Sequence, residues 1–169
     1  MHTESEWNAV ERKLRALARR LIDQEAAHVL VPPYAEATGY WFGAGNVARA
    51  EDGALYLAGR YRNAGDSRTG LAAGERGLEL AVFRAEKHDA PWVKVASWDK
   101  EALSFGDGRV ISIEGACLLP GDTAWELFVS TETTVPYPEG LAAYQKPGTG
   151  VWSIDVFRGA GPESLDTAT

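Results

Sequence analysis

Acidic side chains inside apolar strands are the first candidates for chemistry in this sequence. Glu114 lies in the stretch SIEGACLLPGDTAWELFVST, residues 112–131, where it follows an apolar strand entry and precedes Gly115. A glycine there lets a ligand or another backbone approach closely. Burial at this strand position would also suit a general acid, so Glu114 is a candidate for that role. The alternative is a structural carboxylate that accepts hydrogen bonds from backbone amides or an arginine. Asp155, within a later apolar strand, is a second candidate acid, and otherwise an edge residue or the partner of an arginine.

Two arginines form the next candidate group. Arg60 and Arg62 share one face of an expected strand because they are two residues apart. Guanidinium groups at this spacing can hold a carboxylate-bearing sugar or brace Glu114. The alternative is a pair of structural salt bridges across the sheet, to Glu79 or Glu132.

Aromatic rings and a polar loop offer further contacts for a ligand. Tyr40 and Trp41 are flat rings that can stack on the apolar face of a pyranose, or can instead cover a sheet edge or fill the core. Asp66 and Arg68 lie in the Gly-rich loop 63–77, and loops on rigid scaffolds often carry binding residues. Solvated surface charge is the alternative for these two.

The charge and composition exclude several classes of partner. The 169-residue chain has a formal net charge of -7, which argues against nucleic-acid binding because that requires a basic surface. No stretch of about 18 apolar residues could span a bilayer, so we expect no membrane partner. The three histidines have no metal-ligand spacing and the Gly-rich stretches lack the Lys-Ser/Thr ending of a phosphate loop, so we expect no metal and no cofactor. The lone cysteine, Cys117, is expected in the core; it excludes an internal disulfide and is compatible with a cytoplasmic location.

An internal repeat organises the elements that carry these residues. An offset of 70 aligns Gly45 with Gly115, and an offset of 74 aligns VFR at 82–84 with VFR at 156–158. Alternating apolar and polar residues bounded by turn residues predict antiparallel strands. We expect them at 44–50, 54–62, 78–84 and 92–98 in the first unit and at 113–119, 124–131 and 151–158 in the second, with no strand after Arg158.

An amphipathic helix is expected at the start of the chain, over residues 4–26. Apolar residues recur at helical spacing, and basic residues occupy much of the remaining surface. A basic membrane-surface helix is one interpretation. Acidic residues dilute that charge, so we favour a helix that packs against the β domain.

The strand openings GAGNV and IEGACL, the runs GALYLAGRYR and WELFVS, and the late strand VWSIDVF resemble the five-bladed β-propeller glycoside hydrolases of families 43, 32 and 130. The likeness covers about residues 41–160, nearly two of five blades. It implies an innermost strand that opens on an acid facing a central funnel, and Glu114 matches such an acid. The aligned position in the first unit is Ala44, where family 43 enzymes keep a carboxylate, and glycoside hydrolysis in its usual form needs two.

We therefore expect an all-β chain with antiparallel sheets, a partial five-bladed β-propeller of about two blades, and an N-terminal amphipathic helix. The expected parts are a helix at 1–28, a first blade unit at 29–98 and a second, incomplete unit at 99–169, in a chain that is truncated and self-associates through open sheet edges. The function predicted from the resemblance is glycoside hydrolase-like action on, or binding of, a carbohydrate. The alternative is a non-catalytic sugar-binding or scaffold module, or an inactive propeller fragment.

Overall fold

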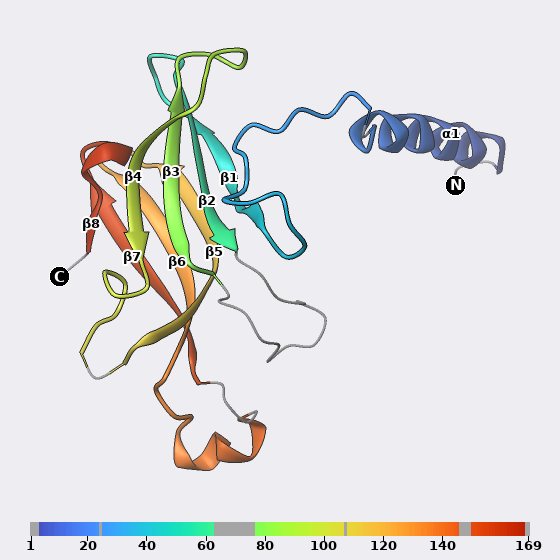
Figure 1. The fold of residues 1–169 in the computed structure, drawn as a ribbon. Helices are drawn as coiled ribbons and strands as arrows, with labels where there is room; N and C mark the ends of the chain where they lie inside the picture. Colours follow the sequence, from blue (N-terminus) through green and yellow to red (C-terminus); the bar gives the residue numbers. More distant parts are fainter. Residues whose placement is uncertain (1–3, 24, 63–76, 107, 146–149, 168–169) are drawn as a thin grey trace. The chain divides into compact units, whose positions relative to one another are not determined.

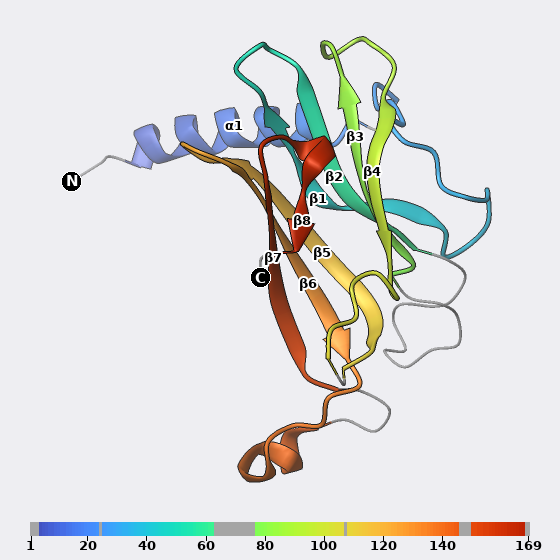
Figure 2. The same cartoon turned by 90° about the vertical axis from the view of Figure 1, so that its left-hand side faces the viewer.

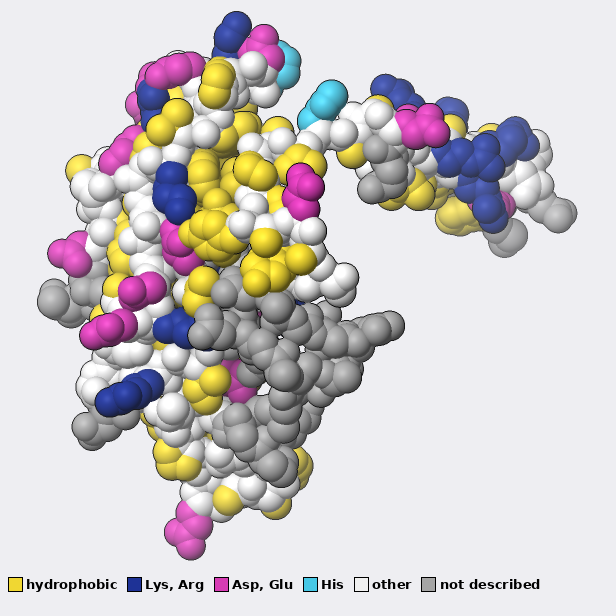
Figure 3. Space-filling view, viewed as in Figure 1, with side chains coloured by type: hydrophobic (Ala, Val, Ile, Leu, Met, Phe, Trp, Pro, Cys, Tyr) yellow, Lys and Arg dark blue, Asp and Glu magenta, His cyan; other side chains and the backbone are white. Residues whose placement is uncertain are grey.

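The computed structural model describes residues 4–23, 25–62, 77–106, 108–145 and 150–167, and the chain divides into two compact units, Met1–Leu30 and Val31–Thr169. The first unit contains one helix, α1 (Glu4–Leu21), which ends earlier than the predicted residue 26. Basic side chains cover much of its surface (Figure 3). No described helix is both long and apolar enough to cross a membrane. Packing of α1 against the β unit stays a prediction.

The second unit contains two antiparallel sheets, each built from consecutive strands (Figures 1 and 2). Sheet one has the order β1 (Trp41–Arg49), β2 (Leu55–Arg62), β3 (Glu79–Ala85) and β4 (Val93–Asp99). Sheet two has the order β5 (Val110–Pro120), β6 (Trp125–Thr133), β7 (Trp152–Gly159) and β8 (Asp166–Thr167). The short 3-10 helices η2 (Glu139–Tyr144) and η3 (Pro162–Ser164) precede β7 and β8. The expected all-β class with antiparallel sheets and one N-terminal helix is confirmed.

Three details differ from the sequence-based expectations. β1 and β5 begin at residues 41 and 110 rather than 44 and 113, because a register shift interrupts each strand and pairing resumes on its other side. The expectation of no strand after Arg158 is wrong, since β8 pairs with β7. A two-residue strand has too few positions to show any alternation. Cys117 is exposed rather than in the core, because the side chain of its neighbour Leu118 points inward.

The main core lies between the two sheets. Sheet one contributes Leu80 and Val82, which have no exposed surface, and sheet two contributes Leu127 and Val129, which are equally buried. Aromatic rings join the sheets at the edge of this core: the rings of Trp98 and Phe157 stack with centroids 5.4 Å apart, and those of Tyr56 and Trp125 are 5.3 Å apart. The strand alternation therefore turns one face of each sheet toward the other.

The opposite face of sheet one is covered by the segment that leads into β1. A second apolar cluster contains Val31, Tyr61, Ala81 and Phe83, all buried. Tyr34 stacks on Tyr61 with ring centroids 3.9 Å apart. Hydrophobic side chains gather over β2 and β3 on this face (Figure 3). The two central strands of sheet one, β2 and β3, are thus buried on both faces.

The domain division expected from the sequence, at 1–28, 29–98 and 99–169, stays a prediction. The contacts of the chain define the two units given above, and both sheets belong to the second of them. Packing between the sheets is extensive enough for Val31–Thr169 to form one compact body.

Candidate functional site

The sheets meet along β1 and β5, and each of these strands carries a β-bulge. In β1 the register with β2 shifts between Gly43 and Asn46, and in β5 the register with β6 shifts between Ile113 and Gly115. The extra residues therefore include Ala44 in β1 and Glu114 in β5, which are aligned positions of the internal repeat. Bulges re-aim a side chain out of the ladder and are common beside functional sites.

Asn46 joins the two strands just beyond the bulges. Its side-chain nitrogen donates to the carbonyl of Leu118 at 2.9 Å, and its side-chain oxygen accepts from the Leu118 N–H at 2.8 Å. At Gly115, an added Cβ would come within 3.3 Å of the Ala44 carbonyl oxygen. Residues of β1 thus meet residues of β5 in the same chain order, so the two strands run parallel. Sequence reasoning overlooked Asn46, although a polar residue in the apolar strand after GAG was the available signal.

Arg60 lies at the centre of the contacts around Glu114. Its Nε donates to the Glu114 carbonyl oxygen at 2.7 Å, and its guanidinium lies 3.6 Å from the Glu114 carboxylate. The same guanidinium sits over the Trp41 ring, 4.7 Å from the ring centroid. The side chain of Arg60 is 9% exposed and that of Glu114 is 20% exposed, although the Oε1 atom of Glu114 is itself buried. We call these three residues the Trp41–Arg60–Glu114 cluster.

Further polar side chains are buried near the same strand ends. Arg62 pairs with Trp41 across the β1–β2 ladder, and Ser112 pairs with Glu132 across the β5–β6 ladder. Arg62 is 7% exposed, and Ser112 and Glu132 are fully buried. Within the described part of the chain, Arg62 Nε and Ser112 Oγ are buried without a hydrogen-bond partner. Such atoms carry a desolvation cost that a ligand or water can relieve. Ser112 was not predicted, because a serine at a strand start has no distinctive sequence signal.

Asp155 is placed apart from this cluster. It lies in β7 opposite Val129 and lines a cavity of about 200 Å³. The other lining residues come from the β4–β5 connection, from β6 and β7, and from the segments that join these two strands: Leu103, Phe105, Gly108, Thr133, Val135, Val151 and Ser153. No contact joins Asp155 to Glu114 within the described residues, so its role as a second acid stays a prediction.

The remaining predicted residues are only partly placed. Tyr40 precedes β1, and its backbone N–H donates to the Ala37 carbonyl at 3.1 Å. Asp66 and Arg68 lie outside the described residues. Three or more His, Cys, Asp or Glu side chains grouped to hold a metal ion do not occur among the residues that the structure describes.

Glu79 belongs to a different group, on the covered face of sheet one. Its carboxylate accepts from Lys94 at 2.7 Å and from the Tyr34 hydroxyl. Burial raises the pKa of Tyr34 well above its ordinary value, and the hydrogen bond to the Glu79 carboxylate raises it further. Glu79 is therefore a partner of Lys94 and Tyr34, while Arg60 pairs with Glu114.

No protein-family model matches the chain, and no curated protein matches its sequence. Among solved structures, the chain is similar to CoXyl43, a GH43 β-xylosidase/α-arabinofuranosidase from a compost microbial metagenome, in complex with xylotriose and in its calcium-free form. The TM-score is 0.53 at 7% sequence identity, and the match covers 84% of this chain. The chain spans 38% of the length of that protein. The likeness shows the fold: the two sheets form part of a β-propeller-like arrangement, as the sequence predicted.

Proposed function

We propose that the chain binds a carbohydrate at the bulges of β1 and β5, through the Trp41–Arg60–Glu114 cluster. The observation that carries this proposal is the contact of an indole ring, a guanidinium and a carboxylate at the place where the two sheets meet. Indole rings pack against the C–H faces of sugars, while charged donors and acceptors bind pairs of hydroxyl groups. The neighbour by fold was solved with xylotriose, which supports a xylose oligomer as the first ligand to test.

Each residue has a distinct role in this proposal. Glu114 accepts hydrogen bonds from sugar hydroxyls through Oε2 of its carboxylate, since Oε1 is buried. Arg60 fixes Glu114 through both the backbone carbonyl and the carboxylate, and it orients the indole ring beneath its guanidinium. Because Arg60 is almost fully buried, it is a positioning residue: it acts on a ligand by holding Trp41 and Glu114 in place.

Binding is favoured over hydrolysis by the residues present at the two bulges. Hydrolysis in its usual form needs an acid and a second carboxylate about 5–10 Å away. The position equivalent to Glu114 in sheet one is Ala44, and Glu132 is fully buried, which prevents a sugar from reaching it. Glu114 as a catalytic acid therefore needs a partner that the equivalent bulge does not supply.

Calorimetric titration of the purified chain with xylotriose and with arabino-oligosaccharides tests the proposal. We expect saturable binding that weakens at least tenfold in Glu114→Gln and in Trp41→Ala. Glu126→Gln is the matched control, because Glu126 lies on the neighbouring strand of the same sheet and pairs with Arg158 at 2.8 Å, outside the cluster. Absence of binding to every sugar in the panel, or equal weakening in the control, would overturn the proposal.

A turnover assay on aryl glycosides separates binding from catalysis. We expect no turnover by the wild-type chain. Turnover that disappears in Glu114→Gln would instead show that the cluster is a hydrolytic site.

A further inference from the structure

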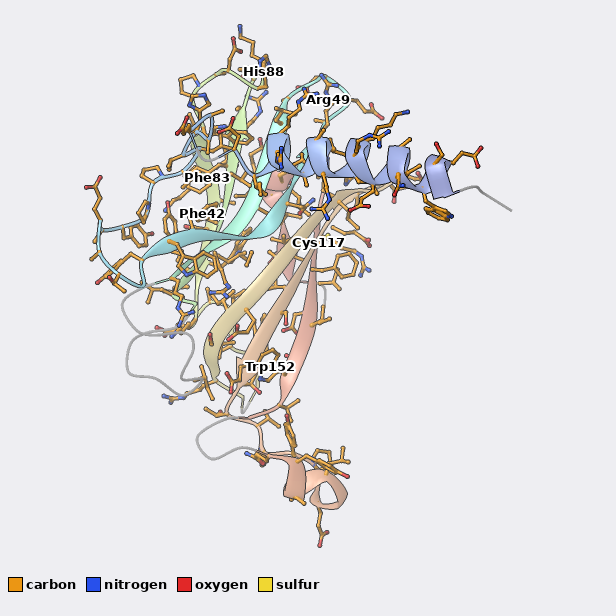
Figure 4. The ribbon with its side chains drawn as sticks, turned by 90° about the vertical axis from the view of Figure 1, so that its right-hand side faces the viewer. Phe42, Arg49, Phe83, His88, Cys117 and Trp152 are labelled. Carbon is orange, nitrogen blue, oxygen red and sulfur yellow. The ribbon has the colours of Figure 1, made fainter. Side chains whose placement is uncertain are left out.

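The outer face of sheet two, which points away from sheet one, carries several exposed apolar side chains and one ion pair, Arg158 with Glu126. Leu119, Trp152 and Ile154 are 43%, 57% and 69% exposed, which is unusual for strand residues of this size. Cys117, Phe128 and Val156 share a row across β5, β6 and β7 on the same face, since they are paired in register. Figure 4 labels Cys117 on β5 and Trp152 on β7. We call this set of residues the outer apolar face.

The internal repeat allows residues of this face to be compared with their aligned positions in sheet one. The offset of 70 places Phe128 at the position of Ala58, and the offset of 74 places Ile154 at the position of Leu80. Ala58 and Leu80 have no exposed surface, because they pack against sheet two in the main core. The β6 and β7 part of the outer apolar face therefore carries apolar residues at the positions with which sheet one packs against another sheet. On β5 the correspondence fails, since Leu119 aligns with the exposed Arg49.

The surface that sheet one would offer in a head-to-tail arrangement is already occupied. The positions equivalent to the inner face of sheet two lie on the opposite side of sheet one, around Tyr61 and Phe83. Both are buried, and Val31 and Tyr34 pack over them. A second copy cannot add its sheet one there without displacing this cover.

We propose that the outer apolar face packs against the same face of a second copy of this chain, in a two-fold symmetric dimer. A two-fold interface uses one patch on both copies and closes, so it buries the exposed strands without open-ended growth. Three strands about 4.8 Å apart that rise about 3.3 Å per residue present a face of roughly 400 Å² per copy, which is small for a specific interface. The dimer should therefore be weak and dissociate on dilution.

Sedimentation velocity of the full chain across a hundredfold concentration range tests this proposal. We expect a monomer–dimer equilibrium that shifts to dimer as concentration rises. Ile154→Glu should weaken dimerisation at least tenfold, because it places two like charges in a desolvated face. Val93→Glu is the matched control: Val93 is a strand residue of sheet one that is 61% exposed, so the variant makes the same chemical change outside the face.

The possible outcomes decide the proposal either way. Both variants replace exposed side chains, and unchanged far-UV circular dichroism should show that they fold. A monomer at all concentrations, or a dimer that Ile154→Glu and Val93→Glu affect equally, would overturn the outer apolar face as the interface. Assemblies that continue to grow with concentration would overturn the two-fold arrangement in favour of an open one. None of these results depends on sugar binding.

Discussion

The bulge in β1 and the bulge in β5 occupy equivalent places in the two sheets, yet they carry different residues. The β5 bulge presents Glu114, a charged group held by Arg60 from the other sheet. The β1 bulge presents Ala44, whose φ of 58° is unusual for a residue other than glycine. One copy of the repeat thus carries a carboxylate at its bulge, while the other carries a positive φ and no charged side chain. The bulge is therefore a structural feature of both sheets, and what each bulge can bind depends on the side chain that it carries.

The glycines that follow the two bulges should differ most in what they tolerate. At Gly45 an added Cβ would lie 1.9 Å from the Ala58 carbonyl oxygen, whereas at Gly115 the nearest atom would be 3.3 Å away. Gly45→Ala must displace the backbone of β2, so we expect a loss of at least about 3 kcal/mol in the free energy of unfolding. Gly115→Ala requires a shift of a few tenths of an ångström and should cost less than about 1 kcal/mol. Chemical denaturation of the two variants measures both values, and equal losses would contradict the asymmetry.

Asn46 is a second point at which the repeats differ, because the aligned position in sheet two is Ala116. Replacing Asn46 with leucine removes both hydrogen bonds to Leu118 and leaves a buried N–H and a buried carbonyl unpaired. We expect the free energy of unfolding to fall by about 2–3 kcal/mol. Hydrogen exchange at the Leu118 amide measures the local effect, which should be a large loss of protection. An unchanged exchange rate at that amide would show that Asn46 does not link β1 to β5.

Substitution of Ala44 can give the β1 bulge the acidic side chain that the β5 bulge has. Aspartate tolerates a positive φ better than most residues do, whereas a β-branched residue does not. Ala44→Asp should therefore change the free energy of unfolding by less than about 1 kcal/mol, and Ala44→Val should lower it by about 1–2 kcal/mol.

The same pair of variants sharpens the functional comparison. Ala44→Asp supplies a carboxylate at the position equivalent to Glu114, so an aryl-xyloside assay on this variant asks whether a second acid alone restores hydrolysis. Equal destabilisation by aspartate and valine would show that the positive φ at residue 44 does not decide which side chains this position tolerates.

Residue spacing was sufficient to predict seven of the eight described strands, and it aligned Ala44 with Glu114 in the repeat. Alternation alone places Arg60 and Arg62 on one strand face, because side chains in a strand alternate strictly. It could not show that Arg60 crosses to Glu114, since that contact depends on how two sheets pack. Nor could it show the bulges: a bulge is a mismatch between two strands, and no single segment encodes it. The dual role of Asn46 was missed for the same reason, because its partner lies 72 residues away.

The smallest expected effect on stability concerns a cross-strand contact that both sheets contain, in which an arginine binds a side chain of the neighbouring strand. In sheet two Arg158 contacts Glu126, and in sheet one the aligned Arg84 contacts the aligned Tyr56 at 3.1 Å. The Tyr56 hydroxyl also donates to Glu163 at 2.7 Å. Burial raises the pKa of Tyr56 above its ordinary value of 10.0, and the hydrogen bond to the Glu163 carboxylate raises it further.

Because the pKa of Tyr56 is higher in the folded state than in the unfolded state, the folded chain binds more protons above pH 10 and its stability falls as the pH rises there. The stabilisation is fully present below pH 10. Tyr56→Phe should reduce this alkaline loss, but only in part, since burial also raises the pKa of Tyr34 and Tyr61. Urea unfolding from pH 8 to pH 11 measures the difference between the variant and the wild type. Glu126→Gln alters the equivalent pair in sheet two and contains no group that titrates in this range, so its stability should follow the wild-type curve. A parallel loss in wild type and Tyr56→Phe would mean that Tyr56 ionises as readily in the folded chain as in the unfolded one.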